Sequence, residues 1–197
     1  MSKRTDTHQI HRGVVNHVIL KLIKRLRQID SWESPPHNLY ERQILNQFIT
    51  DDTMMSHMKE LKGHLFQLLS RINDTTWKFD ISKGIHDNDS LSILKYSGTH
   101  GHNFPWHVDD GPQGHEAPEP YTFGDGSTCR KLAFSIGLTD YRTFEGGVIE
   151  FDNSGLGNSM KLGDIIVWPG YTPHRVLPVT SGTRYTLVGY MHGPIWR

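Results

Sequence analysis

The chain has 197 residues, with 21 Lys and Arg balanced by 21 Asp and Glu, 36% hydrophobic residues and a single Cys. This length fits one domain with enough apolar residues to bury a core, which excludes global disorder. The zero net charge lacks the basic excess of a dedicated nucleic-acid binder. One Cys excludes an internal disulfide framework and a thiolate metal site, and fits a reducing compartment.

The sequence predicts neither a secretory signal nor a membrane span. Its N-terminus is polar, and no run approaches the roughly 18 apolar residues of a membrane helix. We therefore expect a cytoplasmic protein with no membrane partner. The unusual feature of the composition is its 13 histidines, because His is the commonest metal ligand in proteins.

The first part of the chain predicts helices. Between Val14 and Ile29, apolar residues recur at helical spacing and indicate one buried face. The other face of this segment is basic, which favours a solvated surface over a membrane or nucleic-acid contact; it carries Lys21, Lys24, Arg25 and Arg27. A second helix is predicted from a cap near Thr50–Asp52 to Ile72. Residues 1–75 are thus expected to form a helical support region within a single domain, 1–197.

From Trp77 onward, the pattern changes to short strands separated by Gly, Asp, Asn and Pro. Strands are predicted at 77–81, 91–96, 132–138, 148–151, 164–168, 174–177 and 184–190. Because no helices alternate with them, an antiparallel sandwich or barrel is favoured, and the fold class is mainly β with N-terminal α-helices. Residues 76–197 would form this core. The long segment from Asp110 to Thr128, rich in Gly and Pro, is predicted to be a lid.

Trp106-His107-Val108-Asp109 is the most informative segment. On an extended strand, residues two apart point to the same face, so His107 and Asp109 can reach the same metal ion. One imidazole and one carboxylate are two of the three ligands of the facial triad that binds ferrous iron. The candidates for the third ligand that lie downstream are His115, His174 and His192.

His174 is favoured as the third ligand because Arg184 follows it ten residues later. This spacing allows a strand, a turn at 180–182 and a return strand that brings Arg184 beside the metal. A buried Arg needs an anion, and its fork suits a carboxylate. Thr186 shares the face of Arg184 and can offer a hydroxyl to the same carboxylate. Together, these residues predict a small organic acid bound at the iron.

With these residues in place, the chain resembles the Fe(II)- and 2-oxoglutarate-dependent dioxygenases, and within them the prolyl 4-hydroxylase-like group that includes PKHD-type hydroxylases. The resemblance rests on segments in a fixed order, namely 106–109, 145–151, 162–169 and 173–185, with Tyr96 ahead of them. It implies a double-stranded β-helix, also called a jelly roll and similar to the cupins.

The resemblance also implies a role for each site residue. His107, Asp109 and His174 would hold Fe(II), Arg184 would pair with the distal carboxylate of 2-oxoglutarate, and Tyr96 would donate a hydrogen bond to that co-substrate. No catalytic residue is expected beyond the metal ligands. The implied reaction uses O2, with ascorbate as a supporting reductant. It hydroxylates an unactivated C–H bond, of a peptidyl proline in the first instance, and yields succinate and CO2.

Two alternatives remain open at this point: hydroxylation of a free amino acid or other small molecule, or a cupin-like metal-binding module without turnover. Aromatic residues predicted to line a substrate groove are Trp106, Tyr121, Phe123 and Trp168. Arg130 and Arg175 could bind an acidic substrate, but a position at the surface is favoured for both. Related nucleic-acid dealkylases carry a second Arg where this chain has Tyr190, so no nucleic-acid partner is expected. Neither composition nor motifs indicate an oligomeric state.

Overall fold

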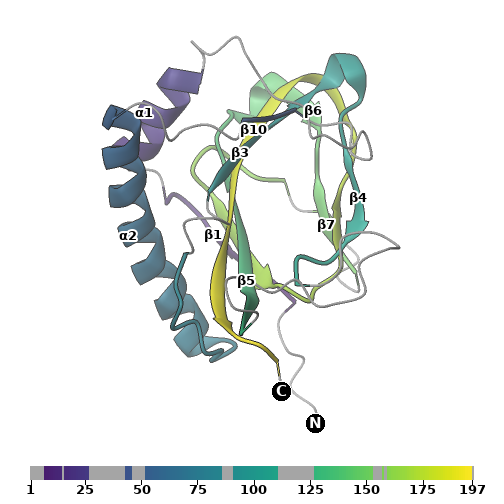
Figure 1. Ribbon diagram of the computed structural model, residues 1–197. Coiled ribbons are helices and arrows are strands. Elements are labelled where there is room, and N and C mark those ends of the chain that lie inside the picture. The colour runs from purple at the N-terminus through teal and green to yellow at the C-terminus, as the bar shows by residue number, and fades with distance from the viewer. Residues whose placement is uncertain are drawn as a thin grey trace.

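The computed structural model describes residues 7–14, 16–26, 43–45, 52–85, 91–110, 127–152, 157 and 159–196. Two antiparallel sheets face each other, and the helices lie outside the larger one (Figure 1). The predicted class, mainly β with N-terminal helices, is confirmed. None of the helices in the described ranges combines the length and the hydropathy needed to span a bilayer.

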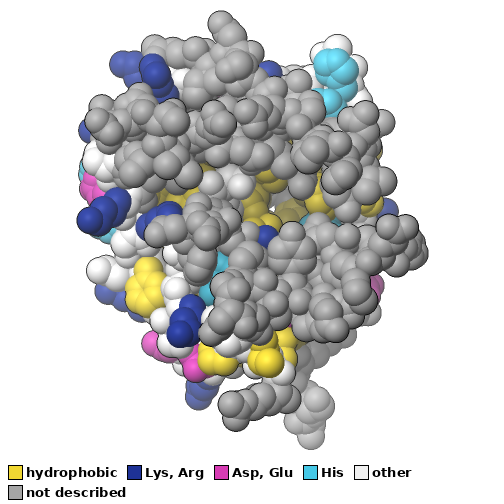
Figure 2. Space-filling model, in the orientation of Figure 1, with side chains coloured by type: hydrophobic (Ala, Val, Ile, Leu, Met, Phe, Trp, Pro, Cys, Tyr) yellow, Lys and Arg dark blue, Asp and Glu magenta, His cyan; other side chains and the backbone are white. Residues whose placement is uncertain are grey.

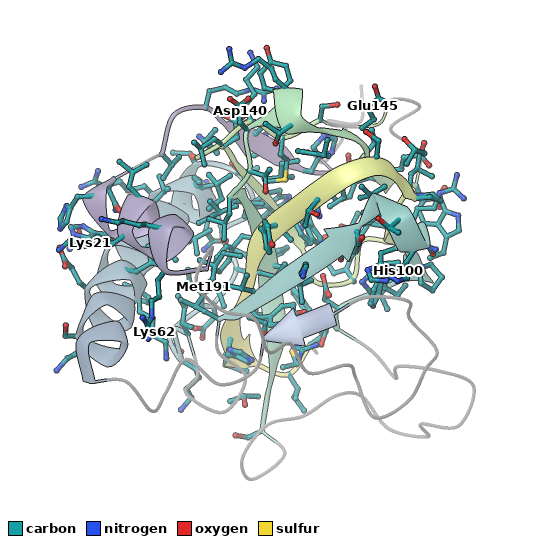
Figure 3. The ribbon with its side chains drawn as sticks, turned by 90° about the horizontal axis from the view of Figure 1, so that it is seen from above. Lys21, Lys62, His100, Asp140, Glu145 and Met191 are labelled. Atoms are coloured by element: carbon teal, nitrogen blue, oxygen red, sulfur yellow. The ribbon has the colours of Figure 1, made fainter. Side chains whose placement is uncertain are left out.

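The helices are α1, His17–Leu26, and α2, Asp52–Thr75. They agree with the two predicted segments, and the described basic residues of α1 are exposed, as expected for a solvated face. In Figure 3, Lys21 lies on the outer side of α1, whereas Met191 lies between the helices and the inner part of the barrel. The basic stripe therefore faces away from the sheets.

The larger sheet is seven-stranded, and its order begins at an edge strand from the N-terminal region. Its strands are β1 (Gln9–His11), β8 (Ile165–Pro169), β5 (Thr128–Gly137), β10 (Val179–Pro194), β3 (Ser92–Ser97) and β2 (Gln43–Leu45), with β6 (Phe144–Gly146) also paired to β10. Residues 1–75 are therefore not purely helical as predicted, because β1 and β2 form the edges of this sheet. Asp164 holds the chain after β1, accepting from the Arg12 guanidinium and the Gly13 N–H.

The smaller sheet has three strands in the order β4 (Phe104–His107), β9 (His174–Val176) and β7 (Ile149–Phe151). Single turns of 3-10 helix, η2 (Gly98–His100) and η3 (Tyr141–Thr143), precede β4 and β6. This sheet lies opposite the inner face of the larger sheet (Figure 1).

The main core lies between α2 and the outer face of the larger sheet. One face of α2 presents apolar side chains one helical turn apart, and the face of β5 that carries its large side chains packs against them. The buried side chains include Leu61, Leu65, Leu69 and Ile72 of α2 and Leu132, Phe134 and Ile136 of β5. Burial of each such side chain stabilises the fold by about 1.5–3 kcal/mol. The opposite face of the sheet is left to line the interior between the sheets.

The strand predicted at 77–81 is wrong, because this segment forms a turn and an irregular stretch. The side chain of Asn73 replaces a ladder partner: its amide donates to the Phe79 carbonyl, at 2.8 Å, and accepts from the Phe79 N–H, at 2.9 Å. Lys78 has a φ of 60°, which strand geometry does not allow. Trp77 and Phe79 still pack on the main core, so their apolar pattern reflects burial without a strand.

The hairpin predicted at 180–182 is also wrong. β10 runs without a turn from Val179 to Pro194, and its first residues pair with β6 across a bulge near Ser181. Residues 177–178 instead carry the chain on from β9 into β10 beside residues 147–148, and β9 and β10 belong to different sheets. Arg184 therefore reaches the interior from the sheet opposite His174, not from its neighbouring strand.

Candidate metal centre

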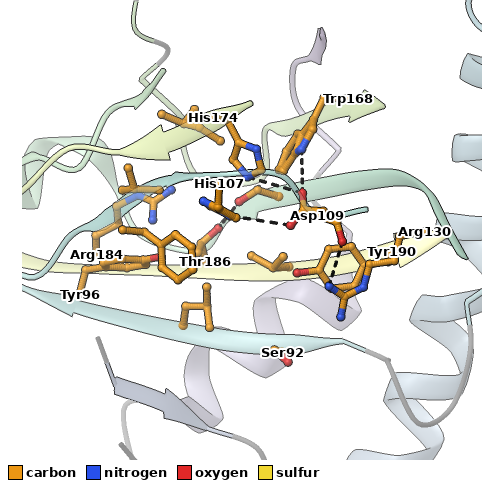
Figure 4. Close-up of a pocket in the computed structure, with 16 residues that line it drawn as sticks. Ser92, Tyr96, His107, Asp109, Arg130, Trp168, His174, Arg184, Thr186 and Tyr190 are labelled. Carbon is orange, nitrogen blue, oxygen red and sulfur yellow. Dashed lines mark hydrogen bonds and ion pairs between the residues drawn. The ribbon is translucent and has the colours of Figure 1, made fainter. Parts of the chain in front are cut away.

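His107, Asp109 and His174 lie together in the interior between the two sheets. One nitrogen or oxygen atom of each lies within 4.8 Å of the others. The Asp109 carboxylate lies between the two rings, with Oδ1 3.8 Å from His107 Nε2 and Oδ2 3.5 Å from His174 Nε2. The structure thus brings together the residues that the sequence singled out as a facial triad (Figure 4).

Both histidines are held in the same way, by the carbonyl two residues before them. His107 Nδ1 is 2.8 Å from the Pro105 oxygen, and His174 Nδ1 is 3.0 Å from the Thr172 oxygen. Because a carbonyl can only accept, each Nδ1 carries the proton in the neutral ring. Each Nε2 therefore keeps its lone pair and faces the carboxylate, which is the arrangement a metal ligand needs.

Asp109 lies beyond the end of β4, although the prediction placed it on the strand with His107. Other contacts fix it: its N–H donates to the Gly170 carbonyl at 2.8 Å, its carbonyl accepts from Arg130 Nη1 at 3.3 Å, and Trp168 Nε1 donates to Oδ2 at 2.9 Å. The turn after β8 thus holds the backbone, while Trp168 holds the carboxylate.

Arg184 lines the same interior and is only 4% exposed. Its Nη1 is buried and has no hydrogen-bond partner among the described residues, and its Nη2 is 4.0 Å from the Met160 sulfur. Tyr96, opposite Arg184 in the β3–β10 register, places its ring 5.1 Å from the guanidinium carbon. Burial lowers the pKa of Arg184, and Tyr96 partly offsets this. The guanidinium stays protonated, and no carboxylate among the described residues pairs with it.

Thr186 also lines the interior, but its hydroxyl donates to a backbone carbonyl and not to the co-substrate carboxylate that the sequence suggested. It donates to the Ile136 carbonyl at 2.9 Å and lies 2.5 Å from the Ser135 hydroxyl. Since a hydroxyl has only one proton, Ser135 donates to Thr186 in this arrangement. The side chain therefore forms part of the wall, and its proton is engaged within the sheet.

Arg130 is the functional candidate that the sequence placed wrongly, at the surface. It is only 8% exposed and lines the interior, where its guanidinium carbon is 3.8 Å from the centre of the Tyr190 ring. The reason is a bulge: Met191 pairs with Leu132, but His192 pairs with Arg130. The extra residue in β5 reverses the side-chain alternation and turns Arg130 inward. Alternation alone could not have revealed this.

The aromatic residues predicted to line a substrate groove have different positions. Trp168 lines the interior, with its N–H on Asp109. Trp106 is 47% exposed and stacks near Arg175, since neighbours on a strand point to opposite faces and His107 points inward. Tyr121 and Phe123 lie outside the described residues, as does most of the predicted lid.

The triad, Arg184 and Arg130 line one cavity with a volume of about 280 Å³. In Figure 4, Arg184 and Tyr96 lie at one end, the triad in the middle, and Arg130 and Tyr190 at the other end. Figure 2 shows hydrophobic side chains, with Lys or Arg and His atoms near them, in a hollow of the molecular surface. The cavity therefore places a cationic group on each side of the triad.

These residues fit a ferrous ion and a dicarboxylate. Two neutral imidazole nitrogens and a carboxylate form the donor set of non-haem Fe(II) oxygenases. Arg184 Nη1 lies in the same cavity and has no partner in the described part of the chain, so it can bind an anion such as a carboxylate. The metal and the anion would thus be bound by described residues within one cavity.

Comparison with known families agrees with this geometry. Residues 91–192 match the family model of the 2OG-Fe(II) oxygenase superfamily. A PKHD-type hydroxylase from Hyphomonas neptunium is 34% identical over 74 residues, which are 36% of this chain and 33% of that protein. The chain thus aligns with about a third of the length of this curated relative.

Solved structures share the fold at low sequence identity. A prolyl hydroxylase from Trichoplax adhaerens, in complex with a peptide fragment of the oxygen degradation domain of hypoxia inducible factor, has a TM-score of 0.66 at 14% identity, covering 95% of this chain and 84% of that one. A prolyl-4-hydroxylase from Pseudomonas putida has a TM-score of 0.63 at 15% identity, covering 94% and 91%. The predicted double-stranded β-helix is confirmed.

Proposed function

Because the chain belongs to the 2OG-Fe(II) oxygenase superfamily, we propose that it is a dioxygenase that hydroxylates an unactivated C–H bond and converts 2-oxoglutarate to succinate and CO2. The observation that carries this proposal is the buried Arg184, whose Nη1 has no partner among the described residues and which shares a cavity with the triad. A module that only bound a metal would have no use for this cation, whose burial is costly.

His107, Asp109 and His174 would hold Fe(II), which together with 2-oxoglutarate and O2 supplies the oxidising chemistry. The backbone carbonyls behind both histidines accept from Nδ1 in the neutral ring, so the lone pair of each Nε2 would face the metal. The side chain of His107 is 16% exposed and that of His174 only 5%. The metal would therefore be reached from the His107 side.

Arg184 would bind the distal carboxylate of 2-oxoglutarate, and Tyr96 would donate a hydrogen bond beside it. Both lie at one end of the cavity (Figure 4), so the co-substrate would reach from there to the metal. Thr186 and Ser135 line the wall along this path, with their hydroxyls already paired to each other. The described apolar side chains of this end, including Leu94 and Val179, exclude water from the ion pair.

The proposed substrate is a prolyl residue of a peptide. A cavity of about 280 Å³ is at the small end for ligand pockets and must also hold the co-substrate, which supports one small side chain reaching the metal while the rest of the substrate stays outside. Arg130 lies at the end opposite Arg184 and could donate to a backbone carbonyl. The similar proteins described above, a PKHD-type hydroxylase and two prolyl hydroxylases, support the same proposal.

The test is succinate formation from 2-oxoglutarate with Fe(II), ascorbate and O2, measured with and without proline-containing peptides and with free proline. We expect the wild type to form succinate and a peptide to gain one oxygen atom in mass spectrometry. His107→Ala and Arg184→Ala should lose both. Absence of succinate with the wild type, or undiminished formation in both variants, would contradict the enzyme proposal. Oxygen gained by free proline alone would favour the small-molecule alternative.

A further inference from the structure

Asp109 is the one triad residue whose position does not come from a strand. β4 ends at His107, so the ladder does not fix the torsion angles of the Asp109 side chain. Its two carboxylate oxygens lie at similar distances from the ring nitrogens, Oδ1 3.8 Å from His107 and Oδ2 3.5 Å from His174. Without a further restraint, both oxygens could face a metal held by the two rings.

That restraint is the indole of Trp168, which donates from Nε1 to Asp109 Oδ2 at 2.9 Å. Both side chains are buried, each with 2% exposure. In such a dry place, a hydrogen bond to a carboxylate is stronger than one between neutral groups. An indole only donates, so in this contact Trp168 is always the donor and Asp109 Oδ2 the acceptor.

The indole itself cannot easily turn away from Asp109. Its ring lies 5.4 Å from Phe151 in an edge-to-face contact and 4.8 Å from His174. It belongs to a buried cluster that also contains Ile149 and Met160. Because packed interiors leave aromatic rings few rotamers, the direction of the N–H is fixed by the core. Trp168 thus links the position of the carboxylate to the packing behind the site.

We infer that Trp168 is a positioning residue: its indole N–H donates a hydrogen bond to Asp109 Oδ2, so that Asp109 binds the metal through Oδ1 alone. The inference rests on the proposed function. A carboxylate that used both oxygens would occupy an additional coordination position, at the expense of 2-oxoglutarate or O2. The hydrogen bond therefore keeps a position open, as oxygen chemistry at this kind of triad requires. Trp168, predicted as a substrate contact, acts in this way through Asp109.

The first experiment is an anaerobic titration of the metal-free protein with Co(II), followed by its visible absorption spectrum. Partners of metal ligands typically contribute about 10- to 100-fold to metal affinity, so Trp168→Phe should bind Co(II) more weakly by about that factor. Its Co(II) spectrum should also change, because the spectrum reports the ligand geometry. Trp77→Phe is the matched control: Trp77 is a partly buried ring on the main core, and this variant should titrate like the wild type.

The outcomes separate this inference from the proposed function. A wild type that binds no Co(II) would refute both. Normal binding and an unchanged spectrum in Trp168→Phe, with binding lost in Asp109→Ala, would refute the positioning role and leave the metal site standing. Weaker Co(II) binding with an altered spectrum in Trp168→Phe, and wild-type behaviour in Trp77→Phe, would support the positioning role.

A second measurement does not depend on how Trp168→Phe folds. In the metal-free wild type, the indole ¹H–¹⁵N resonance of Trp168 should exchange with solvent at least 100-fold more slowly than that of the exposed Trp106. Asp109→Ala should shift the Trp168 resonance and leave that of Trp106 in place. Equal exchange rates for the two indoles, or no shift of the Trp168 resonance in Asp109→Ala, would overturn the inference.

Discussion

Replacing Arg184 with methionine should stabilise the protein on its own and remove its response to 2-oxoglutarate. The guanidinium is 4% exposed, and its Nη1 has no partner among the described residues. Methionine keeps an unbranched chain that can pack near Met160 and Tyr96, but it removes the charge. The substitution therefore separates the cost of burying the cation from its value as a binding group.

The two effects have opposite signs and can be sized. An unsatisfied buried polar group costs about 1–3 kcal/mol, and more if it is charged, so Arg184→Met should raise the free energy of unfolding by about that amount. For a chain of 150–250 residues, 1 kcal/mol shifts Tm by about 2–4 °C. Loss of one partner from a buried charge pair costs about 2–5 kcal/mol of binding, or roughly 30-fold to several-thousand-fold in Kd.

The assay is thermal unfolding of the protein alone, with Mn(II), and with Mn(II) plus 2-oxoglutarate, since Mn(II) can occupy the site without turnover. Ligand binding to the folded state should raise the Tm of the wild type, but 2-oxoglutarate should add no further rise in Arg184→Met. The control is Arg175→Met, which removes a partly exposed Arg that pairs with Glu150 and should keep the full response. A lower Tm of metal-free Arg184→Met, or an intact response to 2-oxoglutarate, would refute the reasoning.

Three further outcomes are expected. Gly147→Ala should raise KM for 2-oxoglutarate, because Gly147 has a φ of 61° and a Cβ there would lie 2.7 Å from Arg184 Cδ; titration of 2-oxoglutarate in the succinate assay checks this, and an unchanged KM would contradict it. Arg130→Met should weaken peptide hydroxylation more than peptide-independent succinate formation, and an equal loss of both would remove Arg130 from the substrate end. Asp140 is held in its charged form by Arg142, with a pKa of about 2 against 3.8, so its contribution to stability is present above about pH 4 and lost toward pH 2. The Tm difference between wild type and Asp140→Asn should shrink over that interval, and a constant difference would contradict the assignment.

Much of the site could be predicted because its residues are close in sequence or fixed by strand periodicity. His107 and Asp109 are two residues apart, and Arg184 and Thr186 share a face of β10. The predicted route between these residues was nevertheless wrong: Asp109 lies past the strand end, and Arg184 comes from the opposite sheet. Spacing restricts which residues can meet, whereas the route between them depends on sheet pairing at long range.

Other features depend on contacts that no local pattern contains. The alternation at Trp77 and Phe79 is real, but the Asn73 amide takes the backbone groups that a strand partner would have used. Arg130 lies just before the strand predicted at 132–138. Its side chain turns inward because β5 carries one residue more than β10 at that point. Both departures are settled by hydrogen bonds between residues whose pairing the sequence does not specify.

β10 is continuous along the cavity, so the spacing of its residues fixes the distances between the groups that line it. Every second residue from Arg184 through Thr186 and Val188 to Tyr190 faces the interior, and at about 3.3 Å per residue these positions span about 20 Å. On the proposed function, the distance between Arg184 and the triad determines how long a diacid must be for its keto group to reach the metal. The position of Tyr190, at the other end of this row, limits the space left for the substrate. Discrimination between shorter and longer diacids would then arise from the rise of a single strand.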